Sequence, residues 1–161
     1  MTPGHRDHGL MERECGDDMG HVPPRLEEDI GCAARSNVPV LITGSDPEEG
    51  REIACAIDRQ SGSPRGSVEV VDCRERGAFV RLPSPEDTHE RSIVLLQEVH
   101  ALSLNEQAEV DRRLGELRAS RFGEGIRIIA SSSAPLFDRV REGSFDERLF
   151  YRLNVIHMVI A

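Results

Sequence analysis

Short apolar runs alternate with longer segments of helical periodicity along most of this 161-residue chain. The first run, VPVLIT at residues 38–43, is continuously apolar and bounded by polar residues, as expected for a strand buried on both faces of a sheet. Strands of this kind that alternate with helices predict an α/β fold with a parallel sheet. The runs predicted to be strands are residues 38–43, 67–72, 92–96, 126–130 and 155–160.

The segments between these runs carry apolar residues at helical spacing. Ser103 is followed three residues later by Glu106, the signature of a capping box, which predicts the start of a long helix. A second helix is predicted at about residues 49–60, and shorter ones near 26–34, 136–141 and 146–152. The predicted inward residues of the long helix are Leu104, Ala108, Leu114 and Leu117.

Residues 1–24 are rich in Gly, His, Asp and Pro and have no apolar period. This composition predicts a disordered tail ahead of one folded domain at residues 25–161. His5, His8, Cys15 and His21 in the tail are candidate metal ligands. Their spacing matches no tetrahedral site pattern, so we prefer a flexible tail and predict no metal site.

The basic residues of the chain are all arginine, with 20 arginines and no lysine. Any mechanism that needs an ammonium group from this chain is therefore excluded. The formal net charge of −9 argues against direct binding to DNA, which depends on basic patches. A function in transcription would then work through protein contacts.

The cysteines and the apolar runs bear on the cellular location. The four cysteines form no CxxC pair, and Cys55 and Cys73 lie in apolar stretches, so both are predicted to be reduced core residues. No apolar run reaches the length of about 18 residues that a membrane span needs. Residues 1–20 lack the apolar region of a secretory signal. We therefore predict a cytoplasmic protein.

The loop after the first predicted strand is where a ligand would bind. In open α/β sheets, ligands bind at the carboxyl ends of the strands, and an anion binds at the N-terminus of the helix that follows. Residues 44–50 occupy this position, and Asp46, Glu48 and Glu49 among them are acidic. These carboxylates either favour the positive end of the helix dipole or surround a phosphate site, and we prefer the first interpretation.

Four longer segments follow one another in a recognisable order: VLITGSDPEEGREIACAIDR, IVLLQEVHALSLNEQAEVDRRL, RIIASSS and VREGSFDERLFYRLNVIHMVI. Together they resemble the AAA+ ATPase domain of sigma-54-dependent transcription activators, also called the sigma-54 interaction domain. The resemblance implies a P-loop NTPase-like three-layer sandwich with a five-stranded parallel sheet. It also implies ATP and Mg²⁺ as cofactors and sigma-54 RNA polymerase as the target.

The phosphate loop of that family is altered in this chain. Aligned without a gap, Gly44 matches its first glycine, and Gly50 falls on its lysine. The inner glycine positions fall on Pro47 and Glu49, and proline has no N–H to donate. A carboxylate about 4 Å from a phosphate costs about 4 kcal/mol at an effective dielectric constant of 20. These substitutions therefore disfavour a bound nucleotide.

A one-residue shift instead aligns Gly50-Arg51-Glu52 with the family's Gly-Lys-Glu. The shift would rotate the apolar face of the next helix by about 100°, so we prefer the ungapped register. Arg51 remains the candidate cation in the shifted register. Over both registers the family's nucleotide-binding positions are Gly44, Ser45, Gly50, Arg51, Glu52, Gln97 and Ser133.

The second acidic motif of the family ends a strand in Asp-Glu, and here the pair is Gln97-Glu98. Glutamine is neutral and is a poorer ligand for a hard cation. Glu98 keeps the position of the catalytic glutamate, although we prefer to interpret it as an exposed carboxylate at a strand end. Ser133 replaces the asparagine of the first sensor and can donate one hydrogen bond.

The two arginines that the family supplies to a neighbouring subunit correspond to Asp146 and Arg152. The first position is reversed in charge, whereas the second is retained. Arg152 is either a finger-like catalytic residue or a structural ion-pair partner of Glu147 or Glu142, and the sequence favours neither.

Two larger parts of the family are not evident. The GAFTGA loop that contacts sigma-54 is matched only by Gly77-Ala78-Phe79, so we predict a plain connecting loop there. The chain ends at Ala161, directly after the last predicted strand, so we expect no helical lid subdomain.

The resemblance and the substitutions together predict a sigma-54-activator-like AAA+ module in transcription regulation, non-catalytic and with impaired nucleotide binding. One alternative is a weak ATP-binding protein or ATPase that acts on sigma-54 RNA polymerase and uses Arg51. Another is a decaying gene fragment with no stable role. The predicted partners are a sigma-54 activator ATPase, bound through the surface around Arg152, or sigma-54 itself.

Overall fold

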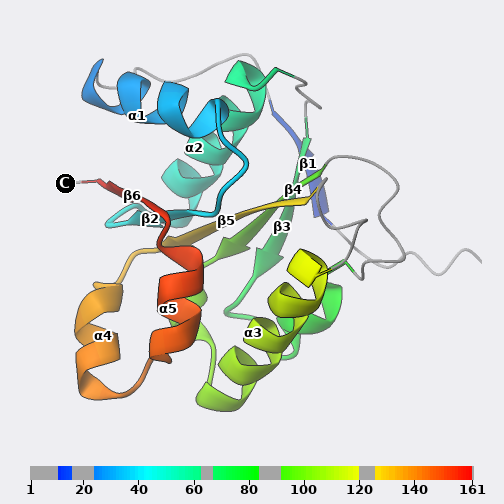
Figure 1. The fold of residues 1–161 in the computed structure, drawn as a ribbon, viewed down its shortest axis with the longest axis vertical. Coiled ribbons are helices and arrows are strands. Elements are labelled where there is room, and N and C mark those ends of the chain that lie inside the picture. The colour runs from blue at the N-terminus through cyan, green and yellow to red at the C-terminus, as the bar shows by residue number, and fades with distance from the viewer. Residues whose placement is uncertain (1–10, 16–23, 63–66, 84–91, 120–125, 161) are drawn as a thin grey trace, which may run out of the picture.

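The computed structural model describes residues 11–15, 24–62, 67–83, 92–119 and 126–160 of the chain. Within this part, one six-stranded sheet lies between two layers of helices (Figure 1). The strand order is β1-β3-β4-β5-β2-β6. The strands are β1 (Met11–Glu14), β2 (Val40–Thr43), β3 (Ser67–Asp72), β4 (Ser92–Gln97), β5 (Ile126–Ser132) and β6 (Ile156–Val159).

Five of these strands, β2 to β6, are parallel to their neighbours, which confirms the predicted five-stranded parallel sheet. β2 lies between β5 and the edge strand β6, with Leu41 opposite Ala130 on one side and His157 on the other. Successive residues of β2 enter the two different cores, since Val40 and Ile42 pack on one face and Leu41 on the other. A strand buried in this way needs the continuous apolar run that predicted it.

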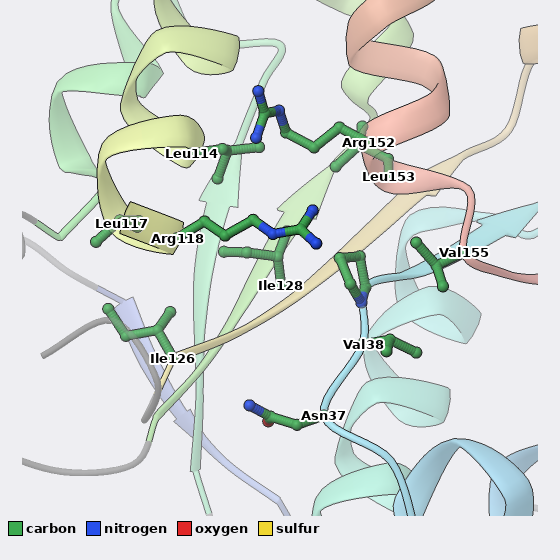
Figure 2. A pocket seen from close by; sticks show the side chains of 11 residues that line it. Asn37, Val38, Leu114, Leu117, Arg118, Ile126, Ile128, Arg152, Leu153 and Val155 are labelled. Carbon is green, nitrogen blue, oxygen red and sulfur yellow. The ribbon is translucent and has the colours of Figure 1, made fainter. Parts of the chain in front are cut away.

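The helices cover the two faces of the sheet unequally. Helices α1 (Pro24–Ala34) and α2 (Pro47–Gln60) pack on one face (Figure 1). Helices α3 (Leu104–Ala119), α4 (Leu136–Glu142) and α5 (Glu147–Leu153) pack on the other, together with the short 3₁₀ helices η1 (Ala78–Arg81) and η2 (Val99–Ala101). Figure 2 shows α3 and α5 side by side over β5, with Leu114, Leu153 and Ile128 between them.

The inward face of α3 differs from the prediction. The capping box is confirmed, since Ser103 Oγ accepts from the Glu106 N–H at 3.2 Å and the Glu106 carboxylate accepts from the Ser103 N–H at 3.2 Å. Leu104, however, is 55% exposed, and Ala108 is also exposed. The prediction was wrong for these two because hydrogen bonds, rather than apolar character alone, decide which side chain is buried at the start of this helix. The buried residues of α3 are Gln107, Val110, Leu114 and Leu117.

A strand within the predicted tail corrects the interpretation of that segment. β1 pairs antiparallel with β3, from Met11 opposite Val70 to Glu14 opposite Ser67. An edge strand is held by backbone hydrogen bonds, so it needs no apolar pattern to form. The other residues of the predicted tail, 1–10 and 16–23, lie outside the described part of the chain, and so do the candidate ligands His5, His8 and His21.

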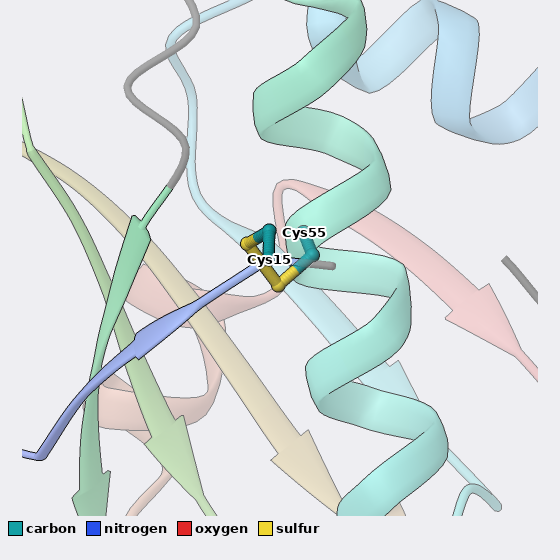
Figure 3. Close-up of a disulfide and its surroundings, with 2 residues drawn as sticks. All are labelled: Cys15 and Cys55. Carbon is teal, nitrogen blue, oxygen red and sulfur yellow. A yellow bond between two sulfur atoms is a disulfide. The ribbon is translucent and has the colours of Figure 1, made fainter. Parts of the chain in front are cut away.

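The cysteine prediction is half wrong. Cys73 is buried and free, as predicted, but Cys55 of α2 forms a disulfide with Cys15 at the end of β1 (Figure 3). Their Cα atoms lie 5.5 Å apart although 40 positions separate them in the sequence. The pairing of β1 with β3 brings the two sulfur atoms together, and no local sequence pattern indicates this bond. Separately, no helix among the described residues is long and apolar enough to cross a membrane.

Candidate functional site

The loop from β2 to α2 lies at the carboxyl edge of the sheet, and it is shorter than predicted. Gly44 has φ +83°, and a Cβ at this position would lie 2.2 Å from the carbonyl oxygen of Ile160, so only glycine fits. Ser45 follows and is buried, and α2 already begins at Pro47. The predicted loop over residues 44–50 is therefore reduced to residues 44–46, and the remainder is helical.

The N-terminus of α2 is closed by the chain's own carboxylates. Asp46 is the N-cap residue, and its Oδ1 accepts from the Glu49 N–H at 2.9 Å. Glu49 Oε2 accepts in return from the Asp46 N–H at 3.3 Å. The Gly50 N–H is already bonded to the Asp46 carbonyl at 3.1 Å. The acidic residues thus form the start of α2, and their carboxylates accept from two N–H groups at this helix start.

Gly50, at the family's lysine position, faces the sheet and has no free space beside it. An added Cβ would lie 3.0 Å from Ser131 Cβ and 3.2 Å from Ser131 Oγ, on β5. Ser45 Oγ would be only 3.4 Å away from the same atom. The Ser45 and Ser131 hydroxyls are both buried and have no hydrogen-bond partner within the described part of the chain. A side chain at position 50 would therefore have to push β5 and α2 apart.

Arg51 borders a pocket of about 270 Å³ at the ends of β3 and β4. Its guanidinium contacts the Glu48 carboxylate at 3.4 Å, and Glu52 beside it is exposed. Two other arginines border the pocket and also have carboxylate partners, so its charges are balanced. The ion pairs are Arg51 with Glu48, Arg74 with Asp72 at 2.7 Å and Arg81 with Glu75 at 2.6 Å. Hydrogen bonds from Arg74 hold the pKa of Asp72 below its ordinary value.

Glu98 is not the exposed carboxylate that the sequence favoured. It is 4% exposed, and its backbone lies in the left-handed region with φ 56°. Its carboxylate accepts from the Ser133 N–H at 3.0 Å and from Ser133 Oγ at 2.6 Å. The two positions meet because β4 and β5 are neighbours and end at the same edge of the sheet. Gln97, one residue earlier, ends β4 and borders the pocket beside Arg51.

His100 joins this cluster, and the sequence interpretation missed it. The Ser132 hydroxyl donates to the Ala134 carbonyl at 2.8 Å, and its oxygen lies 2.9 Å from His100 Nδ1. His100 Nε2 lies 3.5 Å from Glu98 Oε2. Burial lowers the pKa of His100 below its ordinary value of 6.5, while the Glu98 carboxylate opposes this shift. No motif signals the cluster, because a 3₁₀ turn places His100 against β5.

Arg152 lies far along the sheet from this cluster. It borders a second pocket, formed near the amino ends of β2 and β5 (Figure 2). Its Nε donates to Asp111 Oδ1 of α3 at 2.8 Å, so its partner is neither Glu147 nor Glu142. The guanidinium crosses α3 at Gly115, where an added Cβ would lie 3.5 Å from Nη2. The Arg152–Asp111 contact joins residues 41 positions apart, so no local pattern in the sequence indicates it.

Asp146 and Gln107 position the helix that carries Arg152. Asp146 is the N-cap of α5 and accepts from the Leu149 N–H at 3.1 Å. Gln107 is fully buried, and its Oε1 accepts from the Asp146 N–H at 2.7 Å. Its Nε2 donates to the carbonyls of Leu102 at 2.9 Å and Ser144 at 3.0 Å. Gln107 thus joins the start of α3 to the start of α5. A single polar residue in a helical segment of the sequence does not indicate this role.

Comparison with known proteins identifies relatives of this chain. The family described as the sigma-54 interaction domain matches residues 21–161. The regulatory protein AtoC of Escherichia coli K12 is 33% identical over 157 residues, which cover 83% of this chain and 34% of AtoC. The transcriptional regulator NtrC of Proteus hauseri is 31% identical over 169 residues, which cover 88% of this chain and 36% of NtrC. The chain thus spans about a third of the length of these relatives.

Solved structures of similar proteins share the fold. NtrX of Brucella abortus, in complex with ADP, superposes with a TM-score of 0.71 at 25% identity, covering 84% of this chain and 35% of NtrX. The P-loop NTPase domain of a sigma-54 activator from E. coli superposes with a TM-score of 0.54 at 13% identity, covering 78% of this chain and 98% of that domain. The second likeness is one of fold alone, and the order of β2 to β6 is that of these domains.

Proposed function

The chain belongs to the sigma-54 interaction domain family, the AAA+ modules of transcription regulation, and we propose that it is a non-catalytic interaction or regulatory domain with impaired nucleotide binding. The observation that carries the proposal is the closed N-terminus of α2. Asp46 occupies donors of the first helical turn, and Ser131 fills the space beside Gly50.

The electrostatics of this helix start support the proposal. A triphosphate placed there would have to displace the Asp46 carboxylate and approach Glu48 and Glu49, which are exposed. Each like-charge contact at about 4 Å costs about 4 kcal/mol at an effective dielectric constant of 20, before solvent screening reduces it. No lysine exists in the chain to offset this repulsion.

Mg-ATP, the cofactor that the family implies, does not fit the residues present. The position that would help hold Mg²⁺ is Gln97, whose side chain carries no charge. Glu98, at the position of the catalytic glutamate, is held by Ser133 and serves in our proposal to join β4 to β5.

Titration calorimetry with Mg-ATP and Mg-ADP on the purified chain tests the proposal. We expect no measurable heat of binding up to millimolar nucleotide, together with a cooperative thermal melt whose midpoint nucleotide leaves unchanged. A relative with an intact phosphate-loop lysine serves as the positive control. Binding at micromolar affinity would contradict the proposal.

The alternative of a weak ATP-binding protein or ATPase rests on the pocket beside Arg51, which Arg74 and Arg81 also border. If nucleotide binds, Arg51→Ala would abolish the heat under this alternative, whereas the matched change Arg148→Ala on α5 would not. A non-cooperative melt without nucleotide binding would instead favour a decaying fragment with no stable role.

Protein contacts are the second part of the proposal, with a sigma-54 activator ATPase or sigma-54 as the partner. The surface around Arg152 supports it, because Tyr151 beside it is 62% exposed and Phe137 of the neighbouring helix α4 is 57% exposed. Both pack on Phe150, with ring centroids 5.5 Å and 6.1 Å away. Exposed aromatic residues next to arginine are typical of the positions that dominate binding at protein interfaces.

Capture of a family activator's ATPase domain on the immobilised chain tests this surface. We expect retention by the unaltered chain and a loss of about tenfold or more in affinity with Tyr151→Ser, since a central aromatic contributes about 2 kcal/mol or more. Val80→Ser is the matched control, because Val80 is 63% exposed on η1. Failure of the unaltered chain to retain activator or sigma-54, or equal retention by Tyr151→Ser, would contradict this part of the proposal.

A further inference from the structure

A second pocket lies at the edge of the sheet opposite to the start of α2. Its volume is about 310 Å³, which is within the range of small-molecule sites. It opens between the last turn of α3, the end of α5 and the amino ends of β2 and β5 (Figure 2). Because ligands of this fold class bind at the carboxyl ends of the strands, this pocket is separate from the nucleotide region.

Most of the residues that line this pocket are apolar. Figure 2 shows the aliphatic side chains among them, which come from α3, β5, α5 and the segment before β2. Val38 is 36% exposed and Val155 is 53% exposed, so apolar groups also reach the mouth. The apolar lining residues include Val38, Pro39, Leu117, Ile126, Ile128 and Val155. Such walls would release water to an apolar ligand body but would not hold a multiply charged one.

Arg118 lines this apolar pocket and has no carboxylate partner among the described residues. Arg118 of α3 extends across the pocket above Ile128 (Figure 2). Within the described part of the chain its guanidinium has no ion-pair or hydrogen-bond partner, whereas Arg152 at the far side is paired with Asp111. The chain has a net charge of −9, so a guanidinium without a carboxylate partner is unusual in it and can attract an anion. The planar guanidinium also matches the two oxygens of a carboxylate.

We propose that this pocket binds a small amphipathic carboxylate, with its aliphatic or aromatic body between α3, β5 and α5 and its carboxylate on Arg118. The apolar walls select the body, and the Arg118 guanidinium, which has no carboxylate partner among the described residues, selects the head group. The second lining arginine, Arg152, is already paired with Asp111. The site lies away from the nucleotide region, and it shares Arg152 with the proposed partner surface.

Titration of the complete chain with octanoate, followed by amide and methyl NMR shifts, tests the proposal. We expect saturable shifts confined to residues around the pocket and no comparable saturation with octylamine. Octanol, which has the same tail and no charge, should bind about tenfold more weakly than octanoate, because a hydrogen bond to a charged group contributes about that factor. Equal binding of all three probes, or shifts that do not saturate, would overturn the proposal.

Two variants assign the head group and the walls. Arg118→Gln should weaken octanoate about tenfold and leave octanol unchanged, while Arg148→Gln, the same change on α5 outside the pocket, should affect neither. Val155→Phe enlarges an exposed side chain at the mouth and should weaken both probes without lowering the thermal midpoint. Octanoate binding that is indifferent to Arg118→Gln, or to Val155→Phe, would place the ligand elsewhere and overturn the assignment.

Discussion

Replacement of Gln107 by leucine is expected to lower the free energy of unfolding by about 3 kcal/mol, although leucine is apolar and of similar size. The side chain is fully buried and makes three hydrogen bonds to the backbone. The variant would leave the Leu102 carbonyl and the Asp146 N–H without partners in a poorly hydrated place. Each such group costs about 1–3 kcal/mol, and leucine recovers only part of this through apolar burial.

Urea unfolding followed by circular dichroism measures this effect. Gln60→Leu is the matched control, since Gln60 is an exposed glutamine of helix α2, and its change should remain within about 0.5 kcal/mol. Hydrogen exchange gives a second readout, because the Asp146 amide should lose protection in the Gln107 variant first. A change below about 1 kcal/mol, or unaltered protection at Asp146, would show that the buried amide does not hold α5 in place.

Loss of the disulfide between Cys15 and Cys55 is expected to lower the stability of the oxidised protein by about 4 kcal/mol. The bond closes a loop over a sequence separation of 40, and the loss of chain entropy in the unfolded state accounts for the magnitude. The same bond tethers β1 to α2, so its removal should also release β1 from the edge of β3 (Figure 3). A released β1 leaves the backbone groups of β3 exposed to other strands.

The measurement compares urea unfolding of Cys15→Ser with the unaltered protein, each with and without dithiothreitol. Cys32→Ser removes the exposed free cysteine and should change neither curve. Thiol titration of the unfolded, unreduced protein should find the two free cysteines, Cys32 and Cys73, and reduction should raise the number to all four. Four reactive thiols before reduction, or urea unfolding curves that are the same with and without dithiothreitol, would show that the Cys15–Cys55 disulfide does not form.

The elements of the fold were largely predictable because their signals are local. The run at residues 38–43 predicted β2, and the Ser103–Glu106 pair predicted the start of α3, since both depend on neighbours within a few residues. The edge strand β1 was missed for the opposite reason. Its residues, MERE, carry no apolar alternation, and only the open edge of β3 makes a strand favourable there.

The location of the candidate site could be predicted from the sequence, but the contacts between its residues could not. The sequence put the critical loop after β2 and identified Asp46 and Glu49 as an acidic helix start, which the structure confirms. It could not show that α2 begins at Pro47, three residues before the family's lysine position. Nor could it show that Ser131, 81 positions after Gly50, fills the space beside that glycine.

The sequence by itself determined the family, the five parallel strands and the absence of any lysine, because each depends on residue identity and local order. Only the tertiary structure decided that Glu98 is buried on Ser133, that Arg152 pairs with Asp111 and that Cys55 is bonded to Cys15. Each of these contacts joins residues more than 30 positions apart. Which of several equally suitable partners a side chain meets is set by strand order and helix packing, and short-range patterns do not encode either.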